Sequence, residues 1–167
     1  SGKSFCAKGI MVPIMLNSDD EILICDPEGE YAPMVAALMK DECAIIRVAA
    51  GGEDRLNAMY MVDGYGENDP IIVKSQFIMS LIEQIDKNGV GPQHKSIIDR
   101  CVAAIYKEAK DVGYMPTLST LRLKLLEQPE PQAKDIALAL ELFTTGSLDI
   151  FGHGSNVDLE KRVTVFN

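Results

Sequence analysis

Three short apolar runs enclose a long stretch with helical periodicity, and this arrangement limits the chain to a few folds. The runs lie at 21–26, 44–49 and 162–166, and each is short and continuous, as buried parallel strands are. Residues 2–16 and 31–39 have apolar residues at helical spacing and alternate with the first two runs. Helix–strand–helix–strand order is the pattern of an α/β sheet with crossover helices. We therefore predict an α/β fold in which the three runs share one sheet.

The pattern changes to helices from Pro70 onward. Before it, Gly51 to Asp69 is polar and rich in Gly and acidic residues, which indicates a linker or a surface loop. After it, apolar residues recur at helical spacing over four segments, 70–87, 93–112, 117–127 and 132–143. We expect no strand between 72 and 142. Pro13 lies inside the first predicted helix and predicts a kink or an early end there.

The composition excludes several classes of protein. The net charge is -9, which argues against direct binding of nucleic acid, because phosphates need Lys and Arg as partners. No apolar run reaches the roughly 18 residues that span a membrane. The four cysteines form no CxxC pair and no zinc-ligand spacing, so we expect reduced thiols in the cytosol. His94 and His153 have no partners at ligand spacing, so a metal role is not expected for either.

The tripeptide Gly2-Lys3-Ser4 precedes a helix and matches the last three residues of the phosphate-binding loop G-x-x-x-x-G-K-[ST]. In such loops the glycine lets the backbone approach the phosphates, and the helix N-terminus offers free N–H groups. The lysine reaches the β and γ phosphates, and the serine hydroxyl holds magnesium. The same tripeptide also fits a cloning remnant, and the sequence alone leaves both interpretations open.

Asp26 ends the first apolar run and invites two interpretations. Four apolar residues followed by an acid match a Walker B strand, with Asp26 on magnesium. However, Pro27 follows it where an adjacent glutamate would activate a water, and Asp, Pro and Gly are all turn formers. The alternative is therefore a turn.

Several motifs in order resemble the TraC/TraE-type ATPases of conjugation and type IV secretion, which belong to the HerA/FtsK group of hexameric motors. They are G-K-S at 2–4, D-P-E-G-E-Y at 26–31, L-N-A-M at 56–59, Q-H-K-S-I-I-D-R at 93–100 and F-T-T-G-S-L-D-I-F at 143–151. The resemblance covers nearly the whole chain. It implies a partial P-loop, RecA-like sheet from residues 1–60 and 146–167, with an all-helical insertion at 70–145.

The resemblance also implies ligands and roles. ATP and Mg²⁺ bind the complete enzyme, with Gly2, Lys3, Ser4 and Asp26 as nucleotide contacts and Ser4 on the metal. Glu30 is a candidate catalytic residue that positions a water, or else a solvent-facing helix cap. The family's Walker B acid follows the last strand, so we expect a truncated fragment that binds ATP weakly or not at all.

The resemblance further implies that the parent enzyme is a hexamer with other secretion-channel proteins as partners and that it contacts DNA indirectly. It also implies a cytoplasmic location at the inner face of the bacterial membrane. For the fragment we expect self-association through unpaired strand edges and the apolar helix at 2–16. A second interpretation, from the helices alone, is a non-catalytic protein-interaction module. A small P-loop kinase is a third, but the helices lack the arginine-rich lid that it requires.

Overall fold

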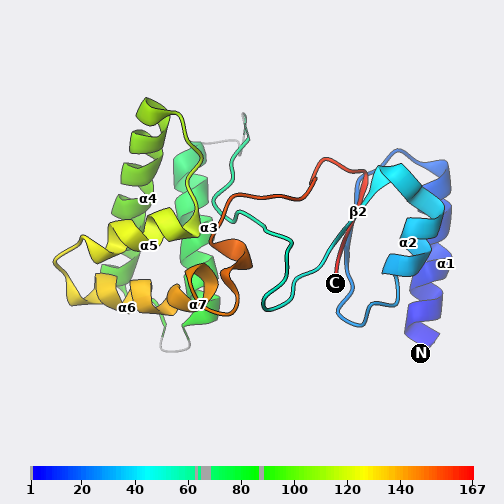
Figure 1. Cartoon of the computed structure of the whole chain (residues 1–167), viewed down its shortest axis with the longest axis horizontal. Helices are drawn as coiled ribbons and strands as arrows, with labels where there is room; N and C mark the ends of the chain where they lie inside the picture. The colour runs from blue at the N-terminus through cyan, green and yellow to red at the C-terminus, as the bar shows by residue number, and fades with distance from the viewer. Residues whose placement is uncertain (1, 63, 65–68, 87–88) are drawn as a thin grey trace. The chain divides into compact units, whose positions relative to one another are not determined.

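The computed structural model describes residues 2–62, 64, 69–86 and 89–167, which fall into two compact units (Figure 1). The sheet unit consists of Ser1–Asp54 and Ser155–Asn167, and the helical unit of Arg55–Gly154. The chain thus leaves the sheet unit once, forms the helical unit, and returns to the sheet. This confirms the predicted fold class, an α/β sheet with an all-helical part placed between two of its strands.

The sheet unit is built on three parallel strands, β1 (Ile22–Cys25), β2 (Cys43–Ile46) and β3 (Val163–Phe166). Their order is β1-β3-β2, so the last strand of the chain lies in the middle and pairs with both others. Placing the three apolar runs in one sheet is therefore correct. β1 and β2 each keep one edge unpaired among the described residues.

Helices α1 (Gly2–Asn17) and α2 (Ala32–Met39) pack on the sheet, and the short turn η1 (Lys40–Glu42) leads from α2 into β2. Their shared core is apolar and comprises Met15, Ile24, Ala32, Val35, Met39, Val163 and Val165. The predicted early end at Pro13 is wrong, because α1 continues to Asn17. The last turn is held by other donors: Asn17 Nδ2 donates to the Pro13 carbonyl at 2.8 Å, and Arg162 donates to the carbonyls of Met15 and Ser18.

The helical unit contains α3 (Pro70–Ile85), α4 (Pro92–Val112), α5 (Leu118–Leu126), α6 (Pro131–Ala139), α7 (Glu141–Thr144) and the turn η2 (Asp149–Phe151). Asp69 caps α3, a Thr117–Thr120 capping box starts α5, and Gly113 ends α4 with a φ of 84°. Among the described residues between 72 and 142 there is no strand, as predicted.

Two sequence predictions need correction in this unit. The helix predicted at 132–143 is divided into α6 and α7 at Leu140, where Phe143 N–H donates to the Leu140 carbonyl in a tighter turn. The polar segment predicted as a surface loop contains Met59, whose side chain is fully buried among α3, α4 and α5. α4 buries the apolar face that its spacing predicts, whereas α3 leaves Phe77 exposed and buries Lys74 and Ser75 beside Ile78 and Ile82.

Candidate functional site

The carboxyl ends of the three strands form one edge, because all three strands are parallel. Asp26 follows β1, Arg47 follows β2 and Asn167 follows β3. These residues, with Pro27, Gly29, Val48 and Ala49, line a cavity of about 320 Å³. In open α/β sheets ligands bind outside the carboxyl ends of the strands. This edge is therefore the candidate site of the sheet unit.

Asp26 is buried and its carboxylate fixes the turn into α2. Oδ1 accepts from Glu30 N–H at 2.9 Å, and Oδ2 accepts from Tyr31 and Ala32 N–H at 2.8 and 3.0 Å. Burial raises the pKa of this carboxyl, but the three backbone donors and the nearby Lys8 ammonium outweigh burial and leave the pKa below its ordinary value. Asp26 thus plays the part that the turn interpretation predicts, and contact with magnesium stays a prediction.

Asn167 and Arg47 were not among the residues singled out from the sequence. Asn167 Oδ1 is enclosed and accepts no hydrogen bond from the described residues, so the edge presents a buried acceptor without a partner. Arg47 has an exposed side chain, while its N–H donates to Asp54 Oδ2 at 2.7 Å. The signal that could have found both is position: Asn167 directly follows the run at 162–166, and Arg47 is the charged residue within the run at 44–49.

The tripeptide Gly2-Lys3-Ser4 starts α1 at the end of the sheet where the strands have their carboxyl ends. Arg162, just before β3, binds the last turn of α1, so that turn lies at the amino ends of the strands. Figure 1 accordingly shows the N-terminus at the end of the sheet unit where β3 stops. The start of α1 therefore lies at the same end of the sheet as the candidate edge, although neither Lys3 nor Ser4 lines the cavity.

Glu30 lies beside the edge with an exposed side chain. Its backbone N–H donates to Asp26, whereas no side-chain bond to the helix start is made by the residue itself. The acceptor that caps α2 is thus Asp26, and the water-positioning role of Glu30 stays a prediction.

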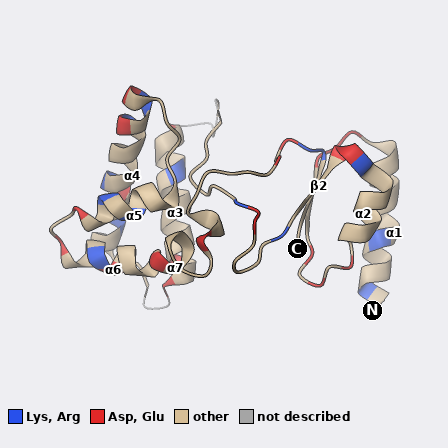
Figure 2. Ribbon diagram, in the orientation of Figure 1, with Lys and Arg blue, Asp and Glu red and all other residues tan. Residues whose placement is uncertain are grey.

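Figure 2 shows acidic and basic residues interspersed along both units. Among the described residues, no group of three or more His, Cys, Asp or Glu side chains is arranged to hold a metal ion. The four cysteines are free thiols. None of the described helices combines the length and the apolar character that a membrane span requires.

Comparison with known proteins shows a likeness of fold. No protein-family model matches the sequence, and no curated protein matches it significantly. Among solved structures, the VirB4 structure of Thermoanaerobacter pseudethanolicus superposes with a TM-score of 0.77 over 98% of this chain at 20% sequence identity. The match spans 65% of the VirB4 chain. The chain therefore shares the fold of VirB4 over nearly all of its length.

Proposed function

We propose that this chain is part of a P-loop motor ATPase of the TraC/TraE type, which powers conjugative DNA transfer or type IV secretion. The observation that carries the proposal is the VirB4-like fold over 98% of the chain. It is supported by the position of Gly2-Lys3-Ser4 at the start of α1, which lies at the same end of the sheet as the carboxyl edge of the parallel strands. In this proposal the sheet unit belongs to the motor core, and the helical unit is an insertion into it.

The residues at the edge suit a nucleoside triphosphate with its metal. The first turn of α1 offers backbone N–H groups without partners in the helix, and Lys3 adds a cation for the β and γ phosphates. Ser4 would hold Mg²⁺, which neutralises charge on the phosphates when bound. Asp26 keeps the β1–α2 turn in place, and Glu30, exposed beside it, would orient a water. The unpartnered Asn167 Oδ1 would accept a hydrogen bond from a ligand group or a water.

Exposed apolar residues in the sheet unit support assembly with further polypeptide. Phe5 and Ile10 on α1 are 83% and 60% exposed, and Leu23 on the β1 edge is 74% exposed. A helix that is apolar on all sides is ordinarily covered on all sides. We infer that the motor works as an oligomer with other secretion-channel proteins, at the inner face of the bacterial membrane.

The test is ATP hydrolysis by the full-length protein that contains this sequence. We expect Lys3→Ala to lower the turnover rate by about a hundredfold or more, because it removes a cation from the transferring phosphate. Lys134→Ala is the control, since Lys134 is an exposed lysine of the helical unit and has no part in the proposed nucleotide site. Normal turnover by the Lys3→Ala protein would refute the proposed site.

A further inference from the structure

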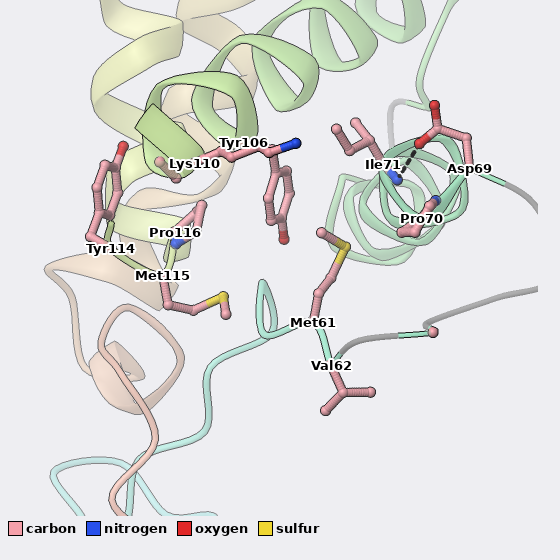
Figure 3. Close-up of a pocket in the computed structure, with 12 residues that line it drawn as sticks. Met61, Val62, Asp69, Pro70, Ile71, Tyr106, Lys110, Tyr114, Met115 and Pro116 are labelled. Atoms are coloured by element: carbon pink, nitrogen blue, oxygen red, sulfur yellow. Dashed lines mark hydrogen bonds between the residues drawn. The ribbon is translucent and has the colours of Figure 1, made fainter. Parts of the chain in front are cut away.

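The helical unit has a cavity of its own, of about 500 Å³, which the motor function does not use (Figure 3). It lies between the start of α3, the last turns of α4 and the two loops that pass them. Figure 3 shows Tyr114, Met115 and Pro116 on one side, Pro70 and Ile71 on the other, and Tyr106 and Met61 between them. The volume falls in the range of ligand and side-chain pockets in other proteins.

The segment 57–61, which brings Met61 to the cavity wall, is held by side chains of the helices. Tyr106 donates its hydroxyl to the Met59 carbonyl, and the Lys74 ammonium donates to the Ala58 and Tyr60 carbonyls at 3.2 and 2.8 Å. Asn57 Nδ2 donates to the Pro116 carbonyl at 2.9 Å, which ties this wall to the loop after α4. The part of the cavity formed by Met61, Tyr106 and Pro116 is thus held in place before a ligand binds.

The opposite wall is fixed by a helix cap. Asp69 Oδ1 accepts from Ile71 N–H at 2.9 Å, so the start of α3 and the side chain of Asp69 are held together at the rim. Pro70 follows as the first residue of the helix. The acidic group on this side of the cavity is therefore engaged by its own helix.

The lining has the chemistry of a protein-docking pocket. It is apolar, with two methionines, two tyrosines and two prolines. Val62, Tyr114 and Met115 keep 55%, 40% and 41% of their surface exposed at the rim. Methionine adapts its shape to a partner, and tyrosine supplies large contact area at low entropic cost. Exposed apolar rims of this kind favour a large partner, because a small ligand is usually enclosed by its pocket.

The charge at the rim selects among partners. Lys110 on α4 lines the cavity, and no described carboxylate lies within ion-pair distance of its ammonium. Lys107, one turn earlier on the same helix, is exposed as well. A partner that places an acidic residue beside α4 gains a charge pair, whereas a basic residue there is repelled.

We propose that this cavity binds a polypeptide partner that inserts one bulky apolar side chain and places an acidic residue against Lys110. The apolar anchor occupies the space between Tyr106, Met61 and Met115. The partner's carboxylate fixes the direction of binding. This inference stands on the helical unit alone and does not depend on ATP hydrolysis.

The experiment measures binding of the whole chain to synthetic peptides of one polar host sequence. The central residue is Ser, Leu, Phe or Trp, and the flanking residues are either Asp and Glu or Lys and Arg. We expect binding only with an apolar centre, and about fivefold tighter binding with acidic than with basic flanks, as one partly exposed ion pair would give. Lys110→Glu should reverse that preference, while Lys134→Glu on α6 should leave it unchanged.

A second pair of variants tests the anchor. Met115→Glu should weaken binding of the best peptide at least tenfold, whereas Leu123→Glu, at another exposed apolar position on α5, should not. Circular dichroism confirms that each variant is folded. Binding that does not require an apolar centre, that survives Met115→Glu, or that keeps its acidic preference in Lys110→Glu would overturn the proposal.

Discussion

Replacing Asp26 provides a quantitative test of the site, because its carboxylate is the hub of the β1–α2 turn. The side chain is 1% exposed and accepts three backbone N–H groups at 2.8 to 3.0 Å. In Asp26→Asn the amide oxygen can still accept from Tyr31 and Ala32, but the NH₂ group then faces the Glu30 N–H. One charge-assisted bond is lost and the other two are weakened, so we expect a loss of about 2 kcal/mol in unfolding free energy.

Asp26→Ala leaves all three donors without this acceptor. Allowing for some access of water to the turn, we expect a loss of about 3 kcal/mol. The assay is urea denaturation followed by circular dichroism, with amide hydrogen exchange of residues 30–39 to show that the loss falls on α2. Glu28→Ala, at an exposed position of the same turn, is the control and should change stability by less than about 0.5 kcal/mol.

The same residue predicts a pH dependence. Because the folded pKa of Asp26 lies below its ordinary value of 3.8, its stabilisation is fully present above that value and is lost as the pH falls through the folded pKa. As the pH falls from about 5 through the folded pKa of Asp26, the unfolding free energy of the Asp26→Asn variant should therefore decrease less than that of the wild-type chain. If Asp26→Asn and Asp26→Ala both matched Glu28→Ala in stability, the carboxylate would not organise the turn and our account of this edge would fail.

Three further predictions concern the rest of the chain. Tyr106→Phe removes the donor to the buried Met59 carbonyl and should lower the unfolding free energy measured by urea denaturation by about 1 to 3 kcal/mol. An unchanged unfolding free energy would show that the carbonyl finds another partner. Arg162→Ala removes the donors to the carbonyls at the last turn of α1, so the backbone amides there should exchange faster with solvent. Lys161→Ala should leave their exchange rates unchanged. The chain should self-associate in light scattering across a concentration series, and Leu23→Lys on the open β1 edge should reduce this. A wild-type chain that stays monomeric at high concentration would contradict the last of these.

The sequence was sufficient for the elements whose signal is local. The three strands are short apolar runs ended by polar residues, and the helices of the helical unit have clear periodicity, so periodicity alone predicts both. The division of one predicted helix at Leu140 has no local breaker such as Gly or Pro, so periodicity runs straight through it.

The candidate site was harder to predict because its parts come together only in the sheet. Asn167 and Arg47 are far apart in the chain, and the β1-β3-β2 order makes them neighbours of Asp26 at one edge. The wall at 57–61 was missed for a similar reason. Its carbonyls are satisfied by Lys74 and Tyr106, and such distant side-chain donors leave no local pattern in a polar segment.

The most direct test of the central claim is hydrogen exchange of the full-length protein with and without a non-hydrolysable ATP analogue and Mg²⁺. We predict protection at the start of α1, around Lys3 and Ser4, and at the turn that follows β1, because both lie at the end of the sheet where the strands have their carboxyl ends. Protection confined to the helical unit, or absent from both of these segments while the analogue is bound, would contradict the claim that this sheet carries the nucleotide site.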